Sequence, residues 1–245
     1  MTRITLDSGD DTIPLSAGYD DPDAILAITK DGIDGLFGTP KYKEDFTDIP
    51  QRDGVYWPTR LTQGARTITL ECAARTASTI AATQLRDRIN ALWGKPLDII
   101  IEDAAGRRRT AGVLADDPGH AMRWSEQGFE FSLVLYCPDP LLYGEPVIWR
   151  QYREGLIHVE NAGTAPSYPI LRSTAATAFD ITMDGHRVSW SGAARPLVLD
   201  FTDMIPSQGT VRHDDAFRIP PGAWDLKVTQ SGSPDISMEI APAWR

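Results

Sequence analysis

Two segments of the chain alternate apolar and polar residues with a period of two. In residues 66–72 (RTITLEC), Ile68, Leu70 and Cys72 share one face, and threonine and glutamate occupy the other. Residues 129–137 (FEFSLVLYC) follow the same alternation. Because successive side chains of a strand point to opposite faces of its sheet, this pattern predicts two half-buried antiparallel strands.

A single amphipathic helix is predicted over residues 78–93. Its apolar positions recur at i, i+4, i+8 and i+11 and form one stripe, which consists of Ala81, Leu85, Ile89 and Leu92. Ser78 or Thr79 can cap the start of the helix, and Gly94 with Pro96 ends it. Since the stripe is short, we expect this helix to cover one sheet rather than to build a helix bundle.

A hairpin is predicted further along the chain. Residues 97–101 (LDIII) and 109–115 (RTAGVLA) flank the segment AAGRR, and Gly106 supplies the turn that the loop needs. Residues 107–109 are all arginine. Because adjacent residues of a strand alternate sides, three consecutive arginines do not gather on one face. We therefore interpret them as a solvated hairpin tip rather than a phosphate-binding patch.

The character of the sequence changes after the second long strand. Residues 137–146 (CPDPLLYGEP) contain three prolines and a glycine, which stop a strand and mark a domain edge. Short strand-like segments follow at regular spacing, over residues 156–159, 168–172, 179–183, 187–190, 196–201, 224–229 and 236–241. Asp184-Gly185 is a strong signal for a two-residue hairpin loop. The pattern predicts an α+β domain over residues 1–146 and an all-β sandwich over residues 147–245.

Charge argues against one class of function. The 245 residues include 24 basic and 34 acidic side chains, a net charge of −10, which argues against a protein that binds duplex DNA. The imbalance is concentrated near the start of the chain. Residues 1–48 carry 11 acids and 4 bases (−7), whereas residues 147–245 carry 11 acids and 9 bases (−2).

The sequence also bears on the cellular compartment. The first residues, MTRITLDSGDD, lack the apolar run of a signal peptide, and no stretch reaches the roughly 18 apolar residues of a membrane span. We therefore expect synthesis in a cytoplasm. Cys72 and Cys137 are the only cysteines, too few for a disulfide framework or a cysteine-rich zinc site, and we expect both to stay reduced.

No catalytic motif is found, because the chain has no GxSxG, P-loop, GxGxxG or HExxH sequence. The four histidines lack the i, i+2 or i, i+4 spacing of metal ligands, and they are His120, His158, His186 and His213. We interpret the segment His213-Asp214-Asp215 as a solvated loop. The sequence therefore predicts no enzyme, no catalytic residue, no cofactor-binding residue and no metal ligand.

Carboxylates and tryptophans leave other kinds of site open. Two acidic runs lack the spacing of a calcium loop, and they consist of Asp7, Asp10 and Asp11 and of Asp20, Asp21 and Asp23. A glycosidase needs two carboxylates across a sugar, and no local motif supports such a pair although the 34 acids do not exclude one by number. Four tryptophans of the predicted sandwich form either a sugar platform or packing residues, and they are Trp149, Trp190, Trp224 and Trp244. Trp190 alternates with Val188, which favours packing.

A series of segments resembles a known family. In chain order they are DGIDGLFGTP (31–40), QRDG (51–54), RTITLEC (66–72), the amphipathic helix, LDIIIED (97–103), GFEFSLVLYCPDPLLYG (128–144) and VENAGTAPSYPIL (159–171). The last two are the most specific. Together the segments resemble the distal tail protein (Dit) family of phages with long, non-contractile tails. Pro-Gly-Ala-Trp (221–224) departs from the Pro-Gly-Asn turn that is usual in the family.

The resemblance implies a structural protein of the virion. Family members form a hexameric ring at the distal end of the tail, in which a split-barrel-like belt domain surrounds a channel and a galectin-like sandwich projects outward. The ring joins the tail tube to the tail-tip hub or tail-associated lysin. Tape measure and receptor-binding proteins are further expected partners, DNA only passes through the channel, and no membrane is involved.

Two alternative functions remain open at this stage, a carbohydrate-binding module for host recognition and a glycoside hydrolase. Exposed, coplanar tryptophans favour the first, and a carboxylate pair in a cleft favours the second. We also expect acids of residues 1–48, among them Asp20, Asp21 and Asp23, to give the channel a negative wall that repels DNA phosphates. The alternative is that these acids lie in solvated outer loops.

Overall fold

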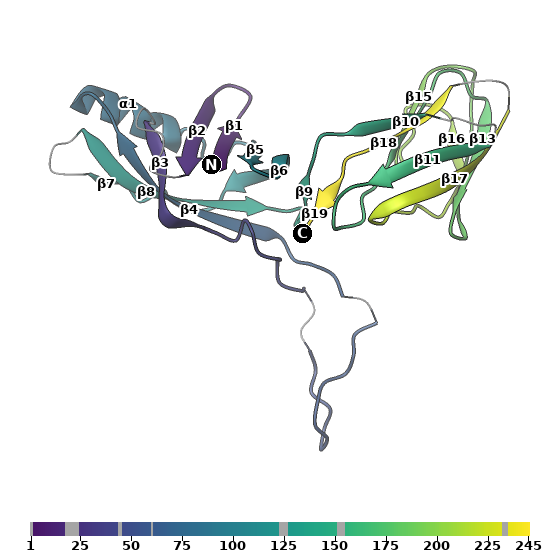
Figure 1. Cartoon of the computed structure of the whole chain (residues 1–245), viewed down its shortest axis with the longest axis horizontal. Helices are drawn as coiled ribbons and strands as arrows, with labels where there is room; N and C mark the ends of the chain where they lie inside the picture. Colours follow the sequence, from purple (N-terminus) through teal and green to yellow (C-terminus); the bar gives the residue numbers. More distant parts are fainter. Residues whose placement is uncertain are drawn as a thin grey trace. The chain divides into compact units, whose positions relative to one another are not determined.

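The computed structural model describes residues 2–17, 25–43, 46–59, 61–122, 127–150, 155–231 and 235–245 (Figure 1). The chain forms two compact units, one of Met1–Leu142 with Arg245 and one of Tyr143–Trp244. The belt role expected for residues 1–146 and the galectin-like accessory role expected for residues 147–245 remain proposals.

The first unit is a closed β-barrel with one helix. Its strands are β1 (Thr2–Asp7), β2 (Thr12–Ala17), β3 (Leu26–Asp34), β4 (Arg66–Arg75), β5 (Leu97–Asp103), β6 (Gly106–Leu114) and β8 (Gly128–Cys137). They are hydrogen-bonded in the order β6-β5-β1-β2-β3-β4-β8, and pairing of β6 with β8 closes the barrel. The β2–β3 pair is parallel, and the other neighbours are antiparallel. The short strand β7 (Ala121–Met122) pairs with β8.

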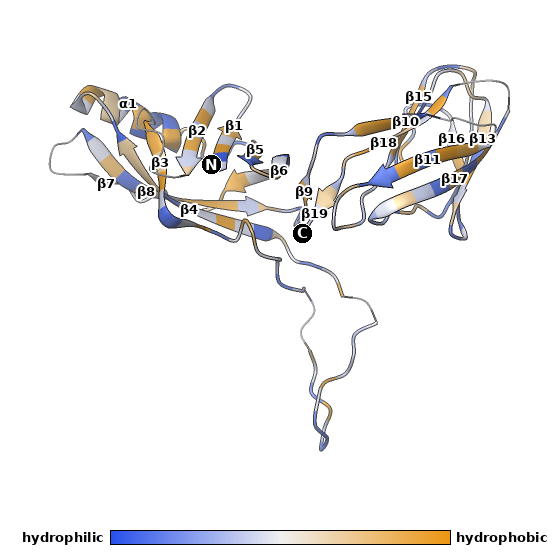
Figure 2. Cartoon of the chain, viewed as in Figure 1, coloured by the Kyte–Doolittle hydropathy of each residue, from blue (hydrophilic) through white to orange (hydrophobic). Residues whose placement is uncertain are grey.

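The two strands predicted from their period of two form the longest pair of the barrel. All ten residues of β4 pair with β8, from Arg66 opposite Cys137 to Arg75 opposite Gly128. Every second residue of β4 is buried, up to Ala74, and the strands carry both apolar and polar positions (Figure 2). The alternation therefore directs one set of side chains into the barrel and the other to its surface.

The predicted helix is confirmed as α1 (Thr79–Asn90). Ser78 caps it, and its hydroxyl accepts a 3.2 Å hydrogen bond from the backbone N–H of Ala81. The buried side chains of the helix are Ala82, Leu85 and Ile89, so the stripe begins at Ala82 and not at Ala81. Spacings of three and four residues follow the 3.6-residue turn more closely than two successive steps of four.

The second unit is a sandwich of two sheets. One sheet has the order β10-β18-β12-β15, with β10 (Val147–Arg150), β12 (Ile170–Ser173), β15 (Leu197–Asp200) and β18 (Ile236–Ile240). The other has the order β11-β17-β13-β14-β16, with β11 (Leu156–Asn161), β13 (Ala178–Met183), β14 (His186–Ser191), β16 (Thr210–Asp214) and β17 (Gly222–Gln230). The short strands β9 (Leu142–Tyr143) and β19 (Ala243–Trp244) are hydrogen-bonded neighbours.

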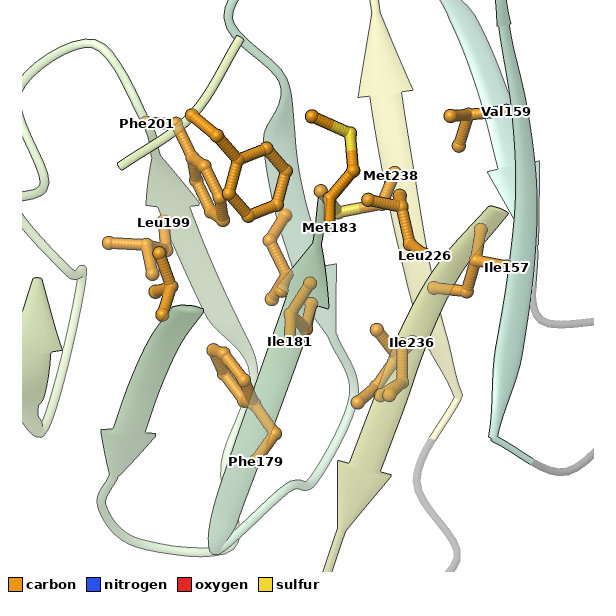
Figure 3. Close-up of a cluster of buried hydrophobic side chains, with 14 of the residues drawn as sticks. Ile157, Val159, Phe179, Ile181, Met183, Leu199, Phe201, Leu226, Ile236 and Met238 are labelled. Carbon is orange, nitrogen blue, oxygen red and sulfur yellow. The ribbon is translucent and has the colours of Figure 1, made fainter. Parts of the chain in front are cut away.

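The inner faces of both sheets share one apolar core. Figure 3 shows Phe179 and Ile181 of β13 in the same layer as Ile236 and Met238 of β18, and all four are buried. Trp190 lies in this core, 1% exposed. The sequence prediction of a packing role for Trp190 is therefore confirmed.

Turn chemistry in the sandwich follows the sequence at one point and departs from it at another. Asp184 and Gly185 join β13 to β14 with positive φ angles of 47° and 86°, as the Asp-Gly signal predicts. The prediction of a loop at His213 and Asp214 is wrong, because both lie in β16. This strand occupies a sheet edge and is mostly exposed, so it lacks the apolar alternation that marks a half-buried strand.

Candidate functional site: an arm between two barrel strands

The most distinctive feature of the barrel is a long loop between β3 and β4, residues 35–65, which we call the arm (Figure 1). The described part of the arm comprises residues 35–43, 46–59 and 61–65. Backbone hydrogen bonds cross it, from Lys43 N to Thr62 O at 2.9 Å and from Tyr56 N to Thr47 O at 2.9 Å. The arm is thus an antiparallel loop whose two sides share only a few backbone hydrogen bonds, and not a full strand pair.

The arm exposes large apolar side chains. Trp57 is 81% exposed and Phe37 is 64% exposed. Further exposed members of this set are Tyr42, Phe46, Val55 and Tyr56. A two-stranded hairpin without an apolar face to pack on is marginally stable in water. Aromatic residues are enriched in the cores of protein interfaces, and this composition is typical of a surface that binds another protein.

The first residues of the arm, 35–38, which we call its root, pack on the barrel. Leu36 is buried, and Gly35 has a φ of +73° that places its backbone against β4. A β-carbon at Gly35 would collide with the carbonyl oxygen of Thr67. Only glycine therefore fits this close approach without displacing β4.

Arg66, the first residue of β4, fastens this root. It is 1% exposed. Its Nη1 donates to the carbonyl oxygens of Gly35 at 2.8 Å, Leu36 at 2.9 Å and Gly38 at 2.8 Å. Its Nε donates to the carbonyl oxygen of Pro140 at 2.9 Å. Burial lowers the pKa of the guanidinium, yet arginine keeps its charge in proteins, so the carbonyl dipoles must stabilise a buried cation.

Sequence reasoning assigned Arg66 no role, although a signal was present. Arg66 has the same parity as Ile68, Leu70 and Cys72, so the period of two already places it on the buried face of β4. A charged residue at the end of a buried stripe indicates either a strand end or a buried polar network. The arm itself has no periodic pattern that marks it.

The acidic residues near the start of the chain are partly paired. Asp11 binds Arg88 at 2.7 Å, and Asp10 binds Lys95 at 3.1 Å. The Arg88 hydrogen bond holds the pKa of the Asp11 carboxyl below its usual value, against the opposing effect of burial. Asp20, Asp21 and Asp23 lie outside the described residues, so the expected negative channel wall stays a prediction.

The four histidines do not converge. His120 Nε2 lies 2.7 Å from Asn90 Oδ1, and burial lowers the pKa of this histidine. His158 pairs with Asp225 at 2.9 Å, and His186 pairs with Asp215 at 3.1 Å. Within the described ranges, no group of three or more histidine, cysteine, aspartate or glutamate side chains is placed to hold a metal ion.

The other residues that the sequence singled out lie on separate elements. The predicted hairpin is confirmed as the β5–β6 pair, and residues 107–109 lie in β6 directly after its turn rather than in the turn itself. Strand alternation exposes Arg107 and Arg109 and leaves Arg108 half-buried, as the sequence predicts. Trp190 of the sandwich is buried. The other three sandwich tryptophans are half-buried, and they are Trp149, Trp224 and Trp244.

Both cysteines are buried and free. Burial raises the pKa of the Cys72 thiol to about 12 and that of the Cys137 thiol to about 11. Neither thiol therefore has the thiolate character that nucleophilic or redox chemistry needs at neutral pH.

In the part of the chain that the structure describes, no helix is long and apolar enough to cross a membrane.

Comparison with known proteins gives matches in structure but not in sequence. No family model matches the sequence, and no curated protein matches it significantly. The structure is similar to that of phage SPP1 Dit, described as a paradigm of the hub adsorption apparatus in phages that infect Gram-positive bacteria. The identity is 17%, 100% of each chain is covered, and the TM-score is 0.72.

Two further structures share the fold at lower similarity. They are chains of the phage P2 baseplate in its activated conformation, one with calcium and one with strontium. Each is 9% identical, covers 98% of both chains and has a TM-score of 0.54. The resemblance to distal tail proteins is thus confirmed at the level of the fold, and over its whole length this chain has the fold of SPP1 Dit.

Proposed function

We propose that this protein belongs to the distal tail protein family and is a structural component of a bacteriophage tail tip. The observation that carries the proposal is the full-length structural match, because it includes the barrel and the sandwich in one chain. The neighbours come from a hub adsorption apparatus and from phage baseplates, and both kinds of assembly support a structural role at the tail tip.

In this proposal, copies of the chain form a closed ring of six. The barrel unit is the belt around a DNA channel, and the sandwich is a galectin-like accessory domain. The ring joins the tail tube above to the tail-tip hub or tail-associated lysin below. Tape measure and receptor-binding proteins are further partners, and the protein resides in the virion after synthesis in the host cytoplasm.

The arm supports a ring made by head-to-tail contacts. A closed ring with cyclic symmetry needs two different surfaces on each copy, one that reaches out and one that receives. The exposed aromatic side chains of the arm, such as Tyr56 and Trp57, suit the surface that reaches out. The barrel of the next copy is the proposed receiving surface.

The proposal assigns the protein no catalysis, no cofactor and no metal. Its role is mechanical, and shape and interface chemistry suffice for it. The carbohydrate-binding alternative needs an exposed aromatic platform on the sandwich. Trp149, Trp224 and Trp244 are instead half-buried, which favours packing for these side chains.

The oligomeric state of the purified full chain tests this function. We expect native mass spectrometry at tens of micromolar to give a complex of six 27.0-kDa chains, and negative-stain electron microscopy to show rings. A control variant replaces residues 43–62 with a short Gly-Ser linker and keeps the backbone hydrogen bond from Gly64 N to Lys41 O. This variant should keep its circular dichroism spectrum and stay monomeric. A wild-type chain that is monomeric both at high concentration and in isolated tail tips would overturn the proposal.

A further inference from the structure

Arg66 is unusual because it buries a positive charge against backbone alone. Among the described residues, it is the one buried charged side chain. Within the described part of the chain, its hydrogen-bond acceptors are four backbone carbonyl oxygens, and no carboxylate is among them. A buried cation carries a large desolvation cost unless its donors are satisfied. Burying arginine at this position costs more free energy than burying an apolar side chain there, so packing alone does not account for the arginine.

The barrel does not need Arg66 for closure. The β4–β8 ladder runs the full length of both strands, and the buried residues beyond Arg66 on β4 are apolar, beginning with Ile68 and Leu70. The carbonyls of Gly35 and Gly38 lie outside the strands and can be hydrated if the arm root opens. The guanidinium therefore holds the arm root and not the sheet.

The hydrogen bonds join segments that are far apart in the sequence. Three acceptors belong to the arm root, at residues 35, 36 and 38. The fourth is Pro140, 74 residues later, in the segment that follows β8. A planar guanidinium presents donors in fixed directions, whereas a lysine ammonium is a point charge on a flexible stem. Arginine can thus hold both segments at once in one geometry.

We propose that Arg66 is a positioning residue, which clamps the root of the arm to the segment after β8 and presents the arm in one orientation to a second copy of this chain. The inference rests on the proposed ring. A preformed arm loses less conformational entropy on docking than a free one, so the clamp favours assembly without contacting the neighbour.

The Nη2 atom of Arg66 is also buried, and it has no hydrogen-bond partner among the described residues. An unpaired buried donor adds to the free-energy cost of burying the charge. Replacing the buried cation by an apolar residue of similar size removes the cost of burying the charge, and the arm-root carbonyls that it leaves can be hydrated. An apolar replacement is therefore expected to spare the barrel and to release the arm.

The test compares Arg66→Met and Arg66→Lys with Arg75→Met and Arg75→Lys in the full-length chain. Arg75 is the matched control, because it is the exposed residue at the other end of β4. Hydrogen exchange is read at the arm-crossing amides of Lys43, Tyr56 and Gly64, and ring formation is read by native mass spectrometry.

Both Arg66 variants should raise exchange at these amides by about tenfold or more while the β4–β8 amides stay protected. The fraction of chains in rings should fall, and the Arg75 variants should match the wild type. If Arg66→Met unfolds, Arg66→Lys keeps the charge and decides the question. Wild-type exchange and wild-type ring content in Arg66→Lys would overturn the clamp and leave the ring intact. If the wild type forms no ring, the proposed function fails, and the exchange data still decide whether Arg66 orders the arm.

Discussion

Asp11 and Arg88 form a two-point ion pair between the β1–β2 turn and helix α1. Arg88 Nε donates to Oδ2 at 2.9 Å, and Nη2 donates to Oδ1 at 2.7 Å. The contact spans 77 positions of sequence and fastens the helix to the barrel wall. Since the Asp11 side chain is 35% exposed and the Arg88 side chain 50% exposed, solvent screens the pair.

This pair predicts a pH-dependent contribution to stability. The Arg88 hydrogen bond lowers the pKa of Asp11 in the folded state below its value of 3.8, so the stabilisation is present above that pH and is lost as the pH falls through the folded-state pKa. Asp11→Asn should lower the free energy of unfolding by about 0.5 kcal/mol at pH 7, and the difference should vanish near pH 2. Urea titrations at both pH values measure it. Asp10→Asn is the control, because its side chain is 80% exposed and a smaller effect is expected.

Two tryptophans of opposite burial should respond differently to truncation. Trp190 stacks on Phe179 with ring centroids 5.5 Å apart, and its Nε1 donates to Gln208 O at 2.8 Å. Trp190→Ala should cost about 3–5 kcal/mol through the cavity and the unpaired carbonyl. Trp57→Ala should leave thermal stability nearly unchanged and weaken ring formation, because Trp57 is 81% exposed. Calorimetry and native mass spectrometry read the two effects, and equal losses of stability would contradict the assignment.

The cysteines should be unreactive in the folded protein. Burial raises the pKa of Cys72 to about 12 and that of Cys137 to about 11, so almost no thiolate forms at pH 8. Ellman's reagent should label neither thiol in buffer and both in 6 M guanidinium chloride, a denaturing concentration for most domains. Labelling of the native protein within minutes would show that the barrel opens or that these sites are accessible.

The arm root should not tolerate a side chain at Gly35. Its φ of +73° and the Thr67 carbonyl oppose any β-carbon, so Gly35→Ala should lower stability by about 1–3 kcal/mol and loosen the root. Gly38→Ala is the control, since a β-carbon there meets no atom within 4 Å. Thermal unfolding and hydrogen exchange at the arm amides compare the two variants. An equal effect of both substitutions would point to backbone entropy and not to the close approach.

Sequence reasoning identified strands that carry a clear local signal, although it missed β1 and β2, which also bury one face. The β4–β8 pair and the β13–β14 hairpin follow from local alternation and from Asp184-Gly185. By contrast, β3 was not predicted, because an irregularity between Ile28 and Ile33 shifts its register against β4 and breaks the period of two. Such irregularities depend on the partner strand, which a local window of sequence does not contain.

The sequence by itself determined the class of fold, the single helix and the resemblance to distal tail proteins, because periodicity, caps and turns are local signals. Only the tertiary structure decided that β6 closes the barrel on β8 and that the carbonyls of Gly35 and Pro140 meet the Arg66 guanidinium. These contacts join residues that are 31 and 74 positions from Arg66. Their geometry depends on the packing of the whole barrel, since a buried donor binds whichever carbonyls the fold brings within reach.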